Sequence, residues 1–124
     1  MCGIVGYVGM RSAQQVLLDG LEKLEYRGYD SAGVALTQRD GIRVVKSKGR
    51  LSTLRSKLEE LALPQSSCGI GHTRWATHGE PSDVNSHPPS TPRVSIVHNG
   101  LLVNYTALKA RLIAKAYTFA SETD

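Results

Sequence analysis

Two segments of the chain carry apolar side chains along one helical face, and this pattern limits the fold more than any other feature. The first segment covers residues 12–25, where the apolar positions are Val16, Leu17, Leu21 and Leu24. The second covers residues 51–61, where leucines recur at helical spacing: Leu51, Leu54, Leu58 and Leu61. Such a helix is stable when its apolar face packs against another layer of the protein. The sequence therefore predicts two helices whose leucine faces form part of a core.

Short apolar and β-branched runs predict the layer that these helices cover. Residues 4–9 are bounded by glycines, and residues 34–36 and 42–45 flank an Asp-Gly pair that is typical of a β-hairpin. Further strands are expected at residues 68–75, 94–98 and 117–119. A third helix is expected through Ile113, with Asn104 as its cap. The order of these elements predicts an α+β fold with a mixed or antiparallel sheet.

Two polar segments are expected to be loops. Residues 26–33 place Gly and Asp at turn positions, and residues 76–93 contain four of the five prolines. Residues 69–81 form the densest polar stretch, at the end of a predicted strand and the start of the second loop. Binding residues commonly lie at such a place on a rigid scaffold.

Length, charge and cysteine content argue against several classes of protein. The 124 residues allow at most one domain, and the net charge of +4 comes without a basic run that contains aromatics, so we expect no nucleic-acid partner. Cys2 and Cys68 form neither a disulfide framework nor a zinc pair, and the histidines lack metal-ligand spacing. No stretch approaches the roughly 18 apolar residues of a membrane span, and no signal peptide is recognisable. We therefore expect a cytoplasmic protein with free thiols and no metal.

Cys2 is the first candidate for chemistry, because only Met1 precedes it. If Met1 is removed, Cys2 carries a thiol and an α-amine on the same residue. An ordinary thiol has a pKa of about 8.5 and needs a base at neutral pH, whereas an α-amine, with a pKa of about 7.7–8.0, can accept that proton and later return it. The alternative is that Cys2 is simply a buried residue of the first strand.

Arg74 and the pair Asn99-Gly100 are the next candidates. The guanidinium of Arg74 has the planar geometry that binds a carboxylate through two parallel hydrogen bonds, although an Arg at a strand end also commonly forms a surface ion pair. An Asn side-chain amide beside a Gly N–H offers two donors to a developing oxyanion. The alternative for Asn-Gly is an ordinary hairpin turn.

The chain resembles one family in six segments, which follow the family's order: residues 2–9, LEYRGYDSAG (24–33), GIGHTRWATHGEP (69–81), NSHP (85–88), VHNGL (97–101) and SETD (121–124). The family is the glutaminase domain of the glutamine–fructose-6-phosphate aminotransferases, which are N-terminal-nucleophile amidotransferases. The runs YRGYDS and TRWATH resemble this family more than its phosphoribosyl, asparagine-synthetase or glutamate-synthase relatives. The proline-rich run after His87 departs from the family pattern.

The resemblance implies a role for each matching residue at the reacting centre. Cys2 is expected to attack the side-chain amide of L-glutamine while its own α-amine carries the proton. Asn99 and the backbone N–H of Gly100 are expected to form the oxyanion hole. Arg27 and Trp75 are expected to support the nucleophile.

The resemblance also implies residues that select free glutamine. Arg74, helped by Thr77 and His78, is expected to hold the α-carboxylate, and Asp124 is expected to receive the α-ammonium. A site that pairs both charges rejects a peptide or a simple amide, because a missing partner leaves a group unpaired.

The implied fold is an αββα sandwich of which residues 1–124 are the amino-terminal half, that is, a partial class II glutamine amidotransferase (glutaminase) domain. The sugar-isomerase domain, which uses the released ammonia to convert fructose 6-phosphate to glucosamine 6-phosphate, is expected to be absent. The resemblance implies no organic cofactor or metal, and a homo-oligomeric full-length enzyme. We expect little or no synthase activity from these residues alone. The alternative is a catalytically silent binding or regulatory module of the same fold.

Overall fold

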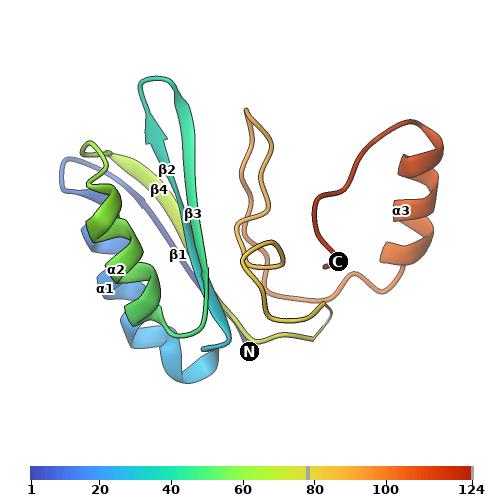
Figure 1. Cartoon of the computed structure of the whole chain (residues 1–124), viewed down its shortest axis with the longest axis horizontal. Coiled ribbons are helices and arrows are strands. Elements are labelled where there is room, and N and C mark those ends of the chain that lie inside the picture. The colour runs from blue at the N-terminus through green and yellow to red at the C-terminus, as the bar shows by residue number, and fades with distance from the viewer. Residues whose placement is uncertain (78, 124) are drawn as a thin grey trace.

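The computed structural model describes residues 1–77 and 79–123, and within them the strands form one antiparallel sheet. The strands lie in the order β1-β4-β2-β3 (Figure 1), with these bounds: β1 Gly3–Val8, β2 Ser31–Gln38, β3 Gly41–Lys48 and β4 Cys68–Arg74. β4 is the last strand in the chain but pairs with both β1 and β2, so it lies inside the sheet. The α+β class with an antiparallel sheet is confirmed.

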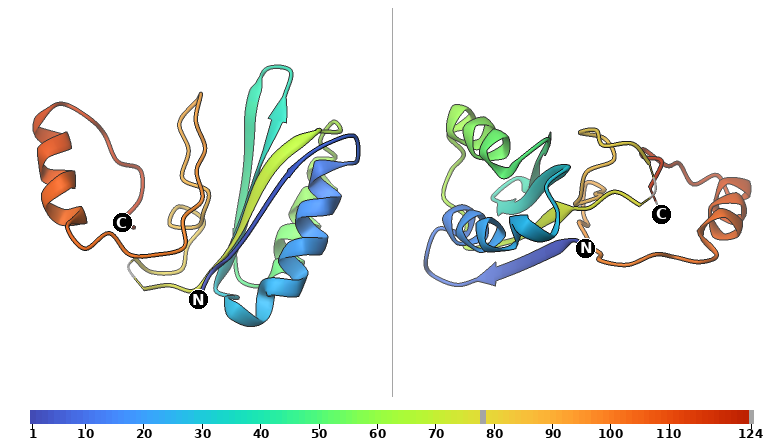
Figure 2. Two further views of the ribbon diagram at one scale, coloured as in Figure 1. Left: turned by 180° about the vertical axis from the view of Figure 1, so that it is seen from behind. Right: turned by 90° about the horizontal axis from the view of Figure 1, so that it is seen from below.

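Helices α1 (Ala13–Leu24) and α2 (Leu51–Leu61) cover one face of this sheet, as Figures 1 and 2 show. Their bounds agree closely with the predicted ranges. The largest buried apolar side chains come from these helices and from β2: Leu17, Leu18, Leu21, Val34, Leu36, Leu54 and Leu58. Burying each such side chain contributes about 1.5–3 kcal/mol, so this helix–sheet layer is the main source of stability.

The predicted hairpin joins β2 to β3. The register pairs Gln38 with Gly41, so the loop consists of Arg39 and Asp40, and Gly41 has a φ of 129° that favours glycine. The expected loop at residues 26–33 is wrong in part. Its first residues lie in a short 3₁₀ helix, η1 (Glu25–Arg27), and its last three extend β2, because they pair with β3 on one side and with β4 on the other.

The segment after β4 crosses the opposite face of the sheet (Figure 1). The expected strand at residues 94–98 is wrong: the structure has there only an isolated bridge between Ser90 and Ser95. A strand needs a neighbour along its length, and within the described residues Val94 and Ile96 remain 56% and 55% exposed. The expected strand at residues 117–119 is wrong for the same reason, since these residues have no strand partner in the described ranges.

The third helix, α3 (Tyr105–Ala114), agrees with the prediction but stands apart from the sheet (Figures 1 and 2). None of its described side chains is buried, and Ile113 is 55% exposed. Asn104 occupies the N-cap position, as predicted, but its side chain makes no capping hydrogen bond with any described residue. Within residues 1–77 and 79–123 no helix has the length and apolar character needed to cross a membrane.

Candidate active site

The ends of β1 and β4 bring Cys2 to the polar segment that follows β4. Gly3 pairs with Thr73 in the antiparallel register, so the residue before Gly3 lies beside the residues after Thr73. The backbone N–H of Trp75 donates to Cys2 Sγ at 3.3 Å, and Sγ lies 3.8 Å from the Trp75 carbonyl oxygen. Cys2 is half-buried and precedes β1, so it is not the buried strand residue of the alternative interpretation.

Asn99 also contacts Cys2, although the two residues are 97 positions apart in the sequence. The backbone N–H of Cys2 donates to Asn99 Oδ1 at 3.3 Å, and Asn99 Nδ2 donates to the Cys2 carbonyl oxygen at 3.3 Å. A side-chain amide nitrogen carries two hydrogens, so the second N–H of Asn99 can serve another acceptor. Gly100 follows in an exposed, non-strand segment. The hairpin alternative for Asn99-Gly100 is therefore wrong within the described residues.

The position of Trp75 depends on two residues whose roles were not predicted from the sequence. A Cβ at Gly28 would lie 2.8 Å from the Arg74 carbonyl oxygen and 3.0 Å from Trp75 N, so the backbone can approach only because Gly28 lacks a side chain. The Asp30 N–H donates to the Arg74 carbonyl at 3.3 Å, and Asp30 Oδ2 accepts the N–H of Ala76. The available signal was the motif YRGYDS, which contains both residues.

Arg74 is 4% exposed, which argues against the alternative of a surface ion pair. Its Nη2 donates to the Gly79 carbonyl at 2.9 Å, and its Nη1 lies 3.5 Å from the Glu80 carbonyl. The loop after β4 therefore folds back over the guanidinium. These contacts hold the charged group of Arg74 in a buried position at the end of β4.

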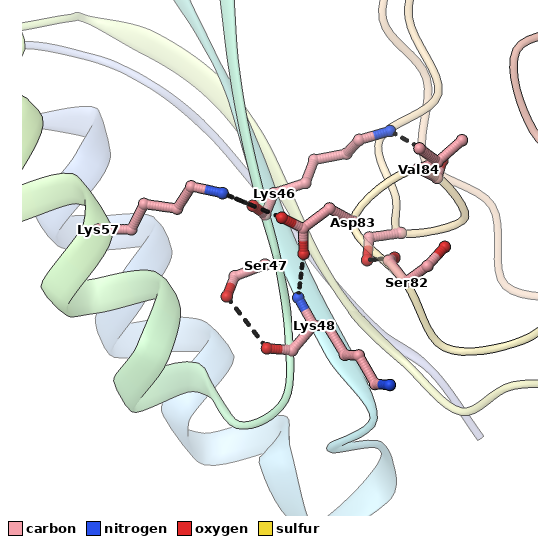
Figure 3. Close-up of polar contacts among 8 residues, drawn as sticks. Lys46, Ser47, Lys48, Lys57, Ser82, Asp83 and Val84 are labelled. Carbon is pink, nitrogen blue, oxygen red and sulfur yellow. Dashed lines mark hydrogen bonds and ion pairs between the residues drawn. The ribbon is translucent and has the colours of Figure 1, made fainter.

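Asp83 attaches this loop to β3 and α2, as Figure 3 shows. Its Oδ1 accepts the backbone N–H of Lys48 at 2.6 Å, and its Oδ2 lies 3.2 Å from Lys57 Nζ. The same ammonium donates to the Lys46 carbonyl at 2.7 Å, and Lys46 Nζ donates to the Val84 carbonyl at 3.3 Å. The hydrogen bond from Lys48, followed by that from Lys57, lowers the pKa of Asp83.

The final described residues lie against the same loop. The side chain of Asn85 accepts the Glu122 N–H at 2.9 Å and donates to Glu122 Oε2 at 3.4 Å. It also donates to the Glu80 carbonyl at 3.0 Å, so one amide joins the loop that covers Arg74 to residue 122. His78 and Asp124, two predicted substrate-binding residues, lie outside the described residues.

The remaining predicted residues lie at the exposed rim. Thr77 is exposed. Arg27 Nη2 lies 3.6 Å from Met1 Sδ, and the Trp75 ring packs edge-on against Tyr29 at 5.9 Å between centroids. Arg27 thus contacts the residue before Cys2, and Trp75 contacts Cys2 through its backbone; their supporting roles stay a prediction.

Two histidines beside the site, the buried His72 and the partly buried His87, were not predicted to have a role. The rings of His72 and His87 stack with centroids 4.1 Å apart, and His72 Nε2 lies 2.8 Å from the His98 carbonyl oxygen. A carbonyl only accepts, so His72 carries its proton on Nε2. Burial lowers the pKa of His72 to about 4, and burial together with the charge of His72 lowers that of His87 to about 3.

Both cysteines are free thiols. Among the described residues, no group of three or more His, Cys, Asp or Glu side chains is arranged to hold a metal ion.

Comparison with known proteins gives relatives over the whole chain. No protein-family model matches the sequence. The chain is 56% identical over 126 aligned positions to the glutamine–fructose-6-phosphate aminotransferase (isomerizing) of Thermus thermophilus, and 57% identical to that of Clostridium acetobutylicum. Each match covers 100% of this chain and 21% of the relative, so the chain spans about a fifth of the length of these relatives. The resemblance stated from the sequence is confirmed.

Solved structures show a similar fold. The glutamine phosphoribosylpyrophosphate amidotransferase of B. subtilis matches with a TM-score of 0.83 and 29% identity, covering 100% of this chain and 27% of that chain. A structure described as the allosteric regulatory enzyme of purine biosynthesis matches with a TM-score of 0.82 and 29% identity, covering 98% of this chain and 27% of that chain. The expected fold of N-terminal-nucleophile amidotransferases is confirmed.

Proposed function

We propose that residues 1–124 form part of a class II glutamine amidotransferase (glutaminase) domain in which Cys2 attacks the side-chain amide of L-glutamine. One observation carries the proposal: Cys2 contacts both the Trp75 N–H, 3.3 Å from its sulfur, and the Asn99 side chain, which is hydrogen-bonded to its backbone. The similarity of the whole chain to aminotransferases that are named for glutamine supports the same conclusion.

The proposed reaction begins once Met1 is removed and the α-amine of Cys2 is free. The amine takes the thiol proton, and the sulfur attacks the amide carbon to give a tetrahedral oxyanion. The second N–H of Asn99 and the N–H of Gly100 stabilise that oxyanion. The intermediate collapses to a γ-glutamyl thioester as the α-ammonium returns its proton to the amide nitrogen, which leaves as ammonia. Water then hydrolyses the thioester, which releases glutamate and the free thiol of Cys2.

Recognition of glutamine is assigned to the loop that follows β4. Arg74 binds the α-carboxylate with help from Thr77 and His78, and Asp124 binds the α-ammonium. A buried guanidinium favours a planar anion over water, because the two parallel hydrogen bonds are charge-assisted. Burial of Arg74 at the strand end supports this assignment.

The wider reaction is proposed from the names of the curated relatives. Ammonia from glutamine would convert fructose 6-phosphate to glucosamine 6-phosphate in a sugar-isomerase domain outside residues 1–124. We propose a cytoplasmic, homo-oligomeric full-length enzyme that uses neither metal nor organic cofactor in the glutaminase step. The synthase step requires the other domain, so we expect little or no synthase activity from these residues alone.

The test is intact-mass spectrometry of the chain before and after treatment with a diazoketone analogue of glutamine. The proposal predicts loss of Met1 and one adduct on Cys2 that excess glutamine blocks. Cys68→Ser, the matched control, should label like the wild type, whereas Cys2→Ser should not label. A chain that is folded by circular dichroism, begins at Cys2 and forms no adduct would contradict the proposal and favour a catalytically silent module.

A further inference from the structure

We propose that His72 is a positioning residue for the proposed glutaminase site: its Nε2–H holds the His98 carbonyl and thereby sets where Asn99 and Gly100 lie relative to Cys2. The inference rests on the proposed function and adds a residue to it. No contact among the described residues joins His72 to Cys2, so its effect would pass through the backbone of residues 98–100.

The segment that carries the oxyanion donors needs such an anchor. Residues 97–101 form neither helix nor strand, and His98, Asn99 and Gly100 are exposed. Among the described residues, the hydrogen bonds that join this segment to Cys2 and β4 are the two between Asn99 and Cys2, at 3.3 Å each, and the one from His72 to the His98 carbonyl, at 2.8 Å. Only the last of these comes from a fully buried side chain.

His72 itself is held firmly. It lies on β4, which is paired on both sides, and it is 0% exposed. Its ring stacks on His87 with an interplanar angle of 16°. The His87 carbonyl in turn lies so close to Gly33 on β2 that a Cβ there would be 2.0 Å away. The donor is therefore fixed by two strands, and the residue next to Asn99 is bound to it.

This placement has a consequence for catalysis. An oxyanion donor contributes about 100-fold to 1,000-fold in rate, and a displacement of about 1 Å of catalytic groups can cost roughly 100-fold. Loss of the His72 bond should thus slow attack by Cys2 on a carbonyl while leaving glutamine recognition by Arg74 intact.

The test compares three variants by covalent labelling at Cys2, using a chloroketone analogue of glutamine and, as a probe that needs no oxyanion hole, iodoacetamide. His72→Phe keeps an aromatic ring against His87 but has no donor, and His72→Gln keeps a donor. His87→Phe is the matched control that alters the stack but not the bond. If His72→Phe fails to fold, His72→Leu replaces it.

We expect His72→Phe to lower the maximal labelling rate by the chloroketone at least tenfold, with its half-saturating concentration unchanged within twofold. Alkylation of Cys2 by iodoacetamide should not change. His72→Gln should recover most of the rate, and His87→Phe should stay within threefold of the wild type. Equal rates in His72→Phe and the wild type, or equal losses in His72→Phe and His72→Gln, would overturn the proposal.

A second measurement separates this inference from the proposed function. If the folded wild-type chain is not labelled at all, the proposed function is contradicted. Whether His72 positions Asn99 is then tested by the hydrogen exchange of the Asn99 side-chain amide, measured by nuclear magnetic resonance. The signals of this amide should be protected from exchange in the wild type and in His72→Gln, and lose protection at least tenfold in His72→Phe. Unchanged protection in His72→Phe would show that His72 does not position Asn99.

Discussion

Gly28 lies directly against the peptide that joins Arg74 to Trp75. A Cβ at Gly28 would be 3.0 Å from Trp75 N, the atom whose hydrogen points at Cys2 Sγ. The φ of Gly28 is −176°, which any residue adopts, so the restriction is one of space and not of backbone conformation. The 3₁₀ turn before Gly28 thus acts as the support for the backbone that contacts the nucleophile candidate.

We predict that Gly28→Ala slows labelling of Cys2 by a ketone analogue of glutamine roughly tenfold, because the new methyl group pushes the Trp75 N–H away from sulfur. Gly6→Ala is the control, since a Cβ at Gly6 on β1 meets nothing within 4 Å. Labelling rates and urea midpoints of both variants check the prediction. Equal labelling rates for the two variants would contradict it.

Arg74→Lys is expected to weaken glutamine recognition while it leaves Cys2 intrinsically reactive. The substitution retains the charge but loses the two-pronged geometry, so the half-saturating concentration of the glutamine analogue should rise about tenfold or more. Alkylation of Cys2 by iodoacetamide provides the internal control. If the rate of alkylation by iodoacetamide also fell about tenfold, the variant would have disturbed the fold, and the prediction would be contradicted.

Asp83→Ala should lower the free energy of unfolding by about 1 kcal/mol, because the Lys48 N–H loses its acceptor and the loop loses its attachment to the edge of β3 (Figure 3). Asp83→Asn should lower it less, because an amide oxygen still accepts from Lys48, and the exposed ion pair with Lys57 adds little. Urea denaturation checks both, with Glu59→Gln on the exposed side of α2 as the control. Equal losses in Asp83→Ala and Asp83→Asn would show that charge dominates this contact.

The stacked histidines predict how stability depends on pH. The pKa values of His72 and His87 are lowered in the folded chain, so the unfolded chain binds more protons below about pH 6.5. Above that pH these groups do not change the free energy of unfolding. Below it the free energy of unfolding falls, and for His72 the fall continues until the pH reaches the folded pKa of about 4. The loss is on the order of 3 kcal/mol for a shift of this size.

The matched comparison is the double variant His72→Phe, His87→Phe, whose unfolding free energy should change less between pH 7 and pH 5 than that of the wild type. The charges of Arg74, Lys46 and His98 also disfavour a proton on this pair. The hydrogen bond to the His98 carbonyl and the charge of Asp30 favour the proton on His72. Identical pH dependences in the two proteins would contradict the prediction.

Much of the fold could be predicted because short stretches of the sequence specify its elements. The leucine spacing of α1 and α2 and the turn at Asp40-Gly41 each specify an element within a dozen residues. The prediction of a strand at residues 94–98 was wrong because a strand, unlike these elements, is not specified by local sequence alone. The apolar residues of that segment resemble a strand, but a strand forms only where a neighbour supplies hydrogen bonds, and that neighbour is not a local property.

In the candidate site, too, some residues could be predicted from the sequence and others could not. Cys2, Arg74 and Asn99 could be named from chemistry and from the resemblance, and the structure places Asn99 in contact with Cys2. The importance of Gly28 and His72 could not be inferred in that way, because each depends on a distance between segments that lie far apart in sequence. A glycine that leaves room for Trp75 and a histidine that binds a backbone carbonyl become recognisable only when β4 is placed inside the sheet.

The proposed glutaminase reaction requires a covalent bond between Cys2 Sγ and the side chain of glutamine. The most direct measurement is mass spectrometry of the chain, prepared to begin at Cys2, mixed with saturating L-glutamine and quenched in acid at successive times. We predict a γ-glutamyl adduct on Cys2 and none on Cys68. A folded chain that carries no adduct on Cys2 at any time would contradict the account.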